Sequence, residues 1–116
     1  MTSTLFIIND APYGSERPYN ALRLAGALSA HDGQLVRVFL LADAVACARA
    51  GQKVPEGYYN LELMLGKLLH RGEVALCGTC MDARGMTEAD LFGSTRRSTL
   101  AELAEWTVQA DKVLVF

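Results

Sequence analysis

Short apolar segments alternate with segments of helical periodicity along this chain, and that alternation restricts the fold more than any other feature. Residues 5–8, 35–41, 74–77 and 113–116 have the length and composition of buried strands. Three segments between them repeat apolar residues at helical spacing, namely 21–28, 61–68 and 100–107. Strands that alternate with helices predict a parallel sheet with right-handed crossovers. We therefore expect a single α/β domain over residues 1–116, with an open parallel sheet of four to five strands and helices on both faces.

Local signals give boundaries within this scheme. Asp43 is expected to cap a short helix, and Gly72 is expected to end the helix that follows it. Thr99 and Glu102 have the spacing of a capping box at the start of the last helix. Residues 91–92 are ambiguous, because they suit either a short edge strand or a loop.

The charge balance and the apolar runs exclude several classes of protein. The formal net charge is −2 and there is no run of basic residues, so a nucleic acid is a poor candidate for a direct partner. The apolar run at residues 5–8 is far shorter than the roughly 20 residues of a membrane-spanning helix and lacks the features of a secretory signal. We expect a cytoplasmic protein without membrane association. Structural disulfides are not expected, because the cytosol is reducing and three cysteines cannot all pair within one chain.

The candidate site lies where the strands end, because ligands of open α/β sheets bind beyond the carboxyl ends of the strands. Three loops leave that edge, and only the last, at residues 77–84, carries conspicuous reactive groups, the thiols of Cys77 and Cys80. Gly78 lets the backbone approach a ligand closely. Arg84 follows Cys80 by four residues, so a helix would place both on one face, where the guanidinium favours a thiolate.

Other chemistry has less support in the sequence. A structural zinc site needs four ligands, whereas Cys77 and Cys80 supply two and no second pair stands at ligand spacing, so no metal is expected. Neither a phosphate-binding nor a dinucleotide-binding glycine pattern is present, so we expect no organic cofactor. Cys47 lies among small apolar residues and is expected to pack in the core.

The string Cys-Gly-Thr-Cys-Met-Asp-Ala-Arg-Gly at residues 77–85 resembles the signature loop of the DsrE/DsrF-like family. The loop at residues 10–14 resembles the family's first loop, and residues 100–116 resemble its closing helix and strand. The resemblance covers nearly the whole chain. It implies a flavodoxin-like sheet, a homo-oligomer that is a trimer or a hexamer, and partners that donate and accept sulfur.

The same resemblance implies a function. In sulfur-relay members, a cysteine at the end of the third strand accepts sulfane sulfur as a persulfide and passes it to a partner protein, and that position matches Cys77. Cys80 is then an auxiliary or resolving thiol, and Arg84 stabilises the thiolate. The surrounding substrate loops are expected to contain Pro12, Tyr13, Gly14, Gly78 and Thr79.

Three functions remain open from the sequence. The leading interpretation is an intracellular sulfur carrier or sulfurtransferase that uses Cys77. The second is a thiol–disulfide redox protein that uses Cys77 and Cys80, because their spacing is that of thioredoxin. The third is a non-catalytic oligomeric module that binds a small ligand and has inert thiols.

Overall fold

A five-stranded parallel sheet with strand order β4-β3-β2-β1-β5 forms the centre of the molecule. The computed structural model describes all 116 residues. The strands are β1 (Thr2–Ile8), β2 (Gln34–Leu40), β3 (Glu73–Cys77), β4 (Arg96–Ser98) and β5 (Lys112–Val115). The α-helices are α1 (Arg17–Ser29), α2 (Leu61–Leu68), α3 (Gly78–Ala83) and α4 (Leu100–Gln109), and the 3₁₀ helices are η1 (Ala42–Ala48) and η2 (Glu88–Asp90). The predicted α/β fold with a flavodoxin-like parallel sheet is confirmed.

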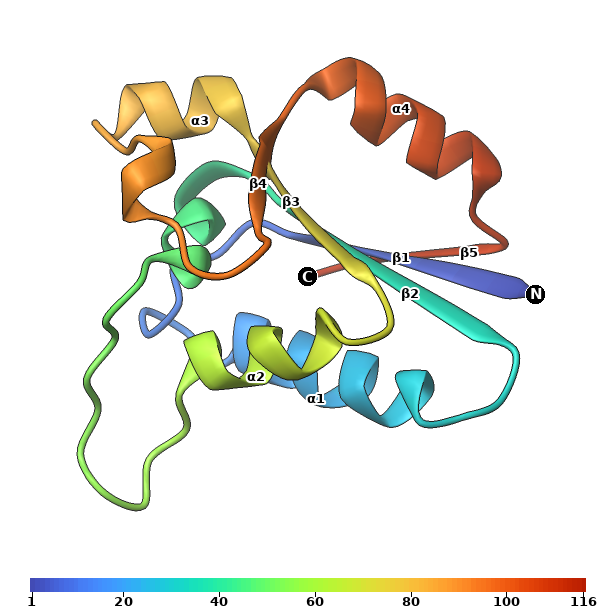
Figure 1. Cartoon of the computed structure of the whole chain (residues 1–116), viewed down its shortest axis with the longest axis horizontal. Coiled ribbons are helices and arrows are strands. Elements are labelled where there is room, and N and C mark those ends of the chain that lie inside the picture. Colours follow the sequence, from blue (N-terminus) through green and yellow to red (C-terminus); the bar gives the residue numbers. More distant parts are fainter.

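The direction in which the chain crosses the sheet explains why helices cover both faces. From β1 to β2 and β3 the chain advances toward one edge, and right-handed crossovers place α1 and α2 on the same face. From β4 the chain returns past three strands to β5, so the same handedness places α4 on the opposite face (Figure 1). None of these helices is long and apolar enough to cross a membrane.

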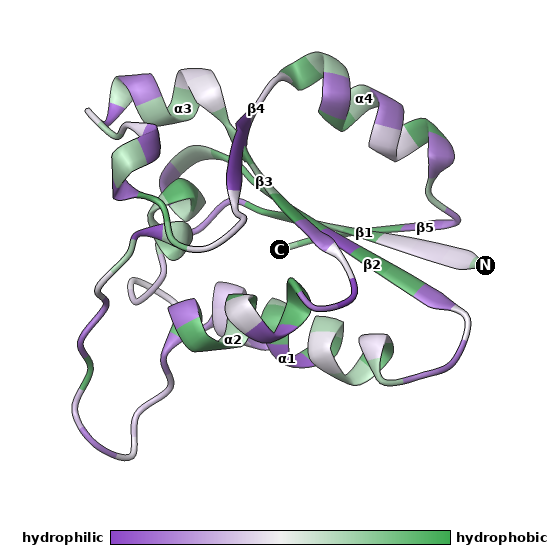
Figure 2. Cartoon of the chain, viewed as in Figure 1, coloured by the Kyte–Doolittle hydropathy of each residue, from purple (hydrophilic) through white to green (hydrophobic).

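Side chains of the central strands alternate between two apolar layers, as the pleat of a strand requires. Phe6 and Ile8 of β1 belong to the larger layer, beneath α1, α2 and η1. Leu5, Phe39 of β2 and Cys77 of β3 belong to the smaller layer, beneath α4. In Figure 2 the later parts of β1, β2 and β3 are coloured as hydrophobic, and these parts contain most of the buried residues of the sheet. Cys77 is therefore both the last residue of β3 and a member of the smaller apolar layer.

A charged network holds α4 and the edge strand β4 against the sheet. The guanidinium groups of Arg37 and Arg96 lie over the ring of Trp106, 5.1 and 5.6 Å from its centroid. Arg96 also binds Glu102 of α4 at 3.0 Å and Glu73 of β3 at 3.3 Å. These contacts tie β3, β4 and α4 together above the smaller layer.

The edge strand is not where the apolar signal suggested. Residues 91–92 lie outside the sheet, although Leu91 forms an isolated antiparallel bridge with Arg49. The edge strand is β4, which is hydrophilic throughout (Figure 2) and pairs with β3 through its backbone. A three-residue edge strand needs no apolar side chains, so periodicity could not reveal it.

Three boundary predictions also need correction. Asp43 does not cap η1, which begins without a side-chain cap, and it pairs with Arg84 instead. The helix α2 ends at Leu68, before Gly72. Thr99 caps α4 by accepting from the amide of Glu102 at 3.2 Å, but the Glu102 carboxylate binds Arg96, so only half of the predicted capping box is confirmed.

Gly72 has a packing role that a substitution can test. A Cβ at this position would lie 2.0 Å from the carbonyl oxygen of Val36, a contact that the backbone must move to avoid. We expect Gly72→Ala to lower the free energy of unfolding by roughly 2–4 kcal/mol, measured by urea denaturation.

The matched control for that experiment is Gly66→Ala, inside α2. A Cβ at Gly66 would meet only the Phe92 ring, at 3.7 Å, which is ordinary contact. Alanine also favours a helix over glycine, so we expect this variant to be equal to the parent protein or more stable by about 0.5–1 kcal/mol. Similar losses in both variants would contradict the packing argument.

Candidate functional site at the carboxyl end of β3

The two cysteines of the predicted site lie at the carboxyl edge of the sheet. Cys77 is the last residue of β3, and Cys80 lies in the first turn of α3. A salt bridge of 2.8 Å between Arg84 and Asp43 joins this segment to η1, which follows β2. The loops leave the same edge of the sheet, as predicted, because all five strands are parallel.

The Cys77 sulfur is nearly enclosed and surrounded by hydrogen-bond donors. The residue is 7% exposed, and its Sγ accepts the backbone amide of Cys80 at 3.4 Å, which caps α3. The Thr79 hydroxyl lies 3.2 Å from the same sulfur. Burial alone would raise the pKa of Cys77. Hydrogen bonds from the side chains and backbone amides of Cys80 and Thr79 outweigh it, so the pKa lies below its ordinary value of 9.0.

Cys80 has the opposite character. Burial raises its pKa above the ordinary value, and its hydrogen bond to the Cys77 sulfur and the charge of Cys77 raise it further. A backbone hydrogen bond from Ala42 and the charge of Arg84 oppose this rise without cancelling it. Cys77 is therefore the more acidic thiol of the pair, and Cys80 is the less acidic one and donates to the Cys77 sulfur.

The residue that completes the Cys80 environment has an unusual backbone. Ala42 has φ of 50°, in the left-handed region that non-glycine residues rarely adopt. It begins η1 directly after β2 and supplies the backbone hydrogen bond to Cys80. Such outliers persist where the surrounding structure holds them, and they concentrate at functional sites. Nothing in the sequence around Ala42 signals this conformation.

Arg84 lies on the Cys80 side of the site. Its Nη1 donates to the carbonyl oxygen of Cys80 at 3.0 Å, and its Nε donates to Asp43. Its charge lowers the pKa of Cys80, as the weakest of the influences on that thiol. Arg84 and Cys80 therefore lie together, as their spacing of four residues predicted. Arg84 is not among the groups that shift the pKa of Cys77.

The guanidinium that sequence reasoning missed belongs to Arg97, on the neighbouring strand. A Cβ on Gly78 would lie 2.8 Å from Cζ and Nε of Arg97, so the space that the glycine leaves is filled by this side chain. Arg97 also binds Asp82 through two parallel hydrogen bonds of 2.8 and 2.9 Å. The hydrogen bond from Arg97 lowers the pKa of Asp82. The only sequence signal for this arrangement is the pair Arg96-Arg97.

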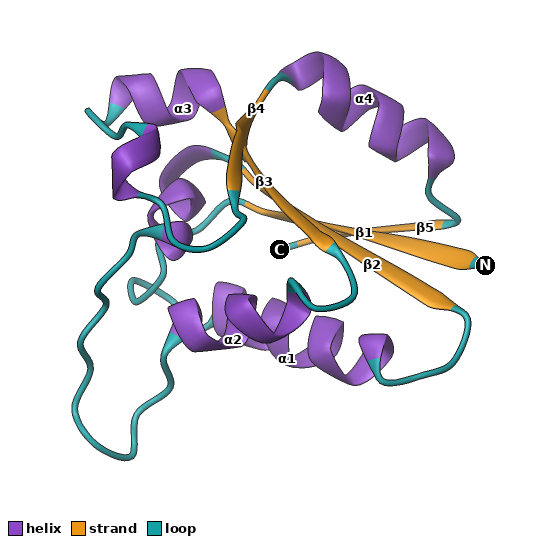
Figure 3. Cartoon of the chain, viewed as in Figure 1, coloured by secondary structure: helices purple, strands orange, loops and turns teal.

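The predicted substrate loops do not come together as one group. Gly78 and Thr79 adjoin Cys77, whereas Tyr13 contacts the long loop between η1 and α2 (Figure 3). The Tyr13 hydroxyl contacts Gln52 and accepts from the Leu61 amide at 3.2 Å. A separate hollow of about 370 Å³ lies there, lined by Tyr13, Lys53, Val54, Pro55, Tyr58 and Tyr59. Pro12 and Gly14 flank Tyr13 in the same loop.

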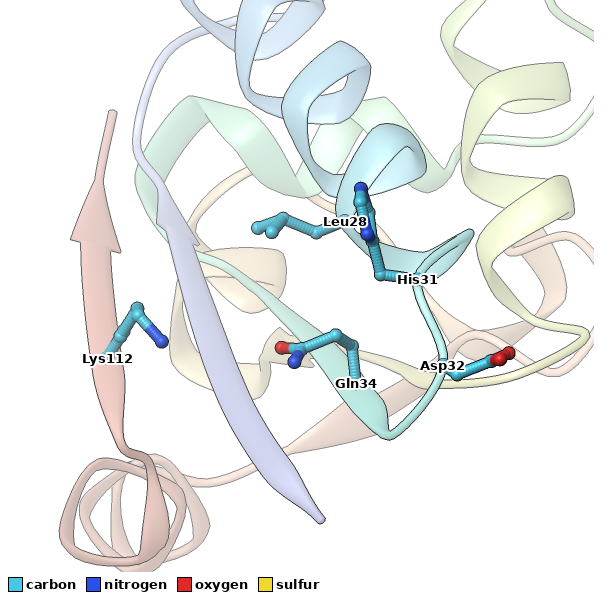
Figure 4. A pocket seen from close by; sticks show the side chains of 5 residues that line it. All are labelled: Leu28, His31, Asp32, Gln34 and Lys112. Carbon is cyan, nitrogen blue, oxygen red and sulfur yellow. The ribbon is translucent and has the colours of Figure 1, made fainter.

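Other openings lie away from the cysteines. A hollow of about 560 Å³ at the amino edge of the sheet is lined by Leu28, His31, Asp32, Gln34 and Lys112 (Figure 4). The strand order reverses between β1 and β5, where such sheets often bind ligands. There the amide of Asn9 donates to the carbonyl of Phe116 at 2.9 Å, and the Phe116 ring stacks on Phe6. The chain itself therefore fills this switch point.

Cys47 plays no part in the site. It is completely buried in the larger apolar layer, and burial raises its pKa to about 12. Its predicted core position is confirmed. Nowhere do three His, Cys, Asp or Glu side chains gather in a way that could hold a metal ion.

The different pKa shifts of the three thiols predict the order in which they react with a small neutral alkylating reagent. At neutral pH we expect Cys77 to react first, Cys80 more slowly and Cys47 only after unfolding, with each site assigned by peptide mass spectrometry. Because its pKa is lowered, Cys77 should gain reactivity at a lower pH than an ordinary thiol.

The Thr79 hydroxyl offers a matched pair of variants for the same measurement. Thr79→Val removes a donor to the thiolate and should move the pH profile of Cys77 to higher pH, whereas Thr79→Ser keeps the hydroxyl and should leave the profile in place. Profiles that move equally in both variants would show that packing, not hydrogen bonding, sets this pKa.

Three comparisons relate the chain to known proteins. The sequence profile of the DsrE/DsrF-like family matches residues 2–116. Protein YchN of Escherichia coli is 46% identical over 118 residues and is covered completely by the chain, as the chain is by it. An uncharacterised protein of Methanopyrus kandleri is 36% identical over 110 residues, which is 95% of this chain and 90% of that one.

Solved structures agree with these sequence matches. The crystal structure of E. coli YchN superposes with a TM-score of 0.94 at 45% identity, over all of both chains. A protein of unknown function from Methanobacterium thermoautotrophicum superposes with a TM-score of 0.77, again over all of both chains, at 12% identity, which demonstrates a shared fold alone.

Proposed function

The chain belongs to the DsrE/DsrF-like family, which is associated with sulfur relay, and we propose that this protein carries sulfane sulfur as a persulfide on Cys77 and passes it to a partner. The observation that carries the proposal is that the hydrogen bonds at this turn make Cys77 the more acidic of the two thiols. Cys77 is the better nucleophile because hydrogen-bond donors stabilise its thiolate, whereas Cys80 stays protonated.

Loading is an exchange between two sulfur anions. The Cys77 thiolate attacks the outer sulfur of a donor R–S–S⁻, a new S–S bond forms at Cys77, and R–S⁻ leaves with the electron pair of the broken bond. The product is the Cys77 persulfide anion, so atoms and charge balance without a cofactor. Delivery is the same exchange in the other direction, with an acceptor thiolate attacking the outer sulfur.

The surroundings of Cys77 suit a sulfur that must be kept as well as passed on. The side chain is almost enclosed, and the Thr79 hydroxyl and the Cys80 amide contact its Sγ. Cys80, with its raised pKa, is a poor nucleophile against the persulfide. We therefore assign Cys80 as a donor that stabilises anionic Cys77.

Intact mass spectrometry under non-reducing conditions tests the carrier function. After incubation with a low-molecular-weight persulfide, we expect the protein to gain the mass of one sulfur atom and to lose it on treatment with dithiothreitol. The gain should disappear in Cys77→Ser and persist in Cys80→Ser. An unchanged mass, or an equal gain in Cys77→Ser, would refute the assignment of Cys77 as acceptor.

One observation favours a second function, a thiol–disulfide redox reaction. A low-pKa thiol beside a protonated thiol three residues later is the arrangement found in dithiol oxidoreductases. Cys80 would then attack the sulfur of a mixed disulfide on Cys77. Titration in glutathione redox buffers separates the two functions, because a redox protein should show a two-electron transition between Cys77 and Cys80 that a pure carrier lacks.

The partners and the location are part of the same proposal. We propose that the protein works in the cytoplasm, where thiols stay reduced, with a donor and an acceptor protein and with further copies of itself in a trimer or hexamer. Self-association has support in exposed apolar side chains on α4 and β5, among them Leu100, Val108 and Val115. Sedimentation equilibrium should give three or six times the mass of the chain, and a monomer would contradict self-association.

A further inference from the structure

The structure assigns Arg97 as the residue that draws negatively charged sulfur donors to Cys77, a role that extends the proposed carrier function and rests on it. Sulfur exchange brings a thiolate and an anionic donor together, and their repulsion opposes the reaction. A cation beside the nucleophile offsets that repulsion.

Arg97 is held against Gly78, the residue that follows Cys77, because Gly78 has no side chain. Its Cζ and Nε lie 2.8 Å from the position that a Gly78 Cβ would occupy, so the guanidinium lies against the residue that follows the nucleophile. The pKa of Arg97 is raised, chiefly by its hydrogen bonds to Asp82 and further by the charges of Asp82, Glu88 and, least of these, Cys77. The two charges are therefore close enough to interact.

Arg97 has more donors to spare than its neighbour Arg96, which donates three hydrogen bonds to Glu73 and Glu102. A guanidinium carries five N–H groups, and Asp82 takes one from each of the two terminal nitrogens of Arg97. The Arg97 side chain is 37% exposed, so its other donors can meet a ligand. Arg96 binds Glu73 and Glu102, and its guanidinium lies over Trp106.

Asp82 orients Arg97 without enclosing it. Its side chain is 61% exposed, and an ion pair so open to water is weak. The carboxylate also cancels part of the positive charge that a donor would meet at Cys77. Removal of Asp82 should therefore increase the attraction of Cys77 for anions, and removal of Arg97 should decrease it.

Two alkylating reagents of similar size but different charge measure this attraction. Iodoacetate is an anion and iodoacetamide is neutral, and both react only with the thiolate, so the ratio of their rates at Cys77 cancels the thiolate fraction. Reactivity of Cys77 is followed by peptide mass spectrometry in the full-length protein at low ionic strength. We expect Arg97→Gln to lower the iodoacetate-to-iodoacetamide ratio by about two- to fivefold.

Three further variants make the test specific. Gly78→Ala keeps every charge but displaces the guanidinium, so it should lower the ratio as Arg97→Gln does. Asp82→Asn should raise it. Arg23→Gln, which removes an equal charge from α1, where Arg23 lies over Tyr19, should leave it unchanged. The differences should shrink in high salt, because salt screens charges that are open to solvent.

The outcomes distinguish this inference from the carrier function. An unchanged ratio in both Arg97→Gln and Gly78→Ala, or an equal fall in Arg23→Gln, overturns the role of Arg97 even when Cys77 gains sulfur. A lowered ratio in a protein that gains no sulfur supports anion attraction by Arg97 and counts against the carrier function alone. Circular dichroism of each variant confirms that the measured protein is folded.

Discussion

The parallel pairing of β3 with β4 is the contact on which the candidate site depends. It sets Leu76 opposite Arg97 and Cys77 opposite Ser98, and the alternation of the short strand then directs Arg96 and Ser98 toward α4 and Arg97 toward α3. A shift of one residue would exchange these faces, placing Arg97 over the tryptophan and leaving Gly78 uncovered. The network around Trp106 opposes that shift because it engages Arg96 from three sides. The contacts that hold Arg96 against α4 therefore also fix the position of the Arg97 guanidinium beside the turn after β3.

Most of the fold could be predicted from the sequence because burial on both faces leaves a continuous apolar run. That is true of β1, β2 and β3. Strand β5 is largely exposed, and its apolar composition alone marked it as a strand. The edge strand β4 escaped because it is three residues long, polar, and held by backbone pairing and ion pairs. The true cap of α4, Thr99, was visible, whereas the partner of Glu102 was not, since Arg96 reaches it through tertiary packing.

The site shows the same division between local and distant contacts. Cys77 and Cys80 could be placed because a parallel strand that ends in a turn exposes its last residues at the edge where ligands bind. The contact between Arg84 and Cys80 could also be predicted, because it spans one helical turn. Arg97 could not, because its approach to Gly78 is set by strand pairing, and nothing local distinguishes it from Arg96. The left-handed Ala42 is likewise imposed by its surroundings.

The spacing of the two cysteines suggests a disulfide, yet the polarity of the pair points the other way. For Cys80 to resolve a sulfur bound at Cys77 it must lose its proton, and burial together with the charge of Cys77 makes that loss harder. A persulfide on Cys77 keeps a negative charge at the outer sulfur, so loading does not remove the cause. Only the charge of Arg84 and the amide of Ala42 favour a Cys80 thiolate, and both remain outweighed. The same hydrogen bond that makes Cys77 reactive thus keeps Cys80 inactive, which favours a carrier that waits for its acceptor over a dithiol that expels its sulfur.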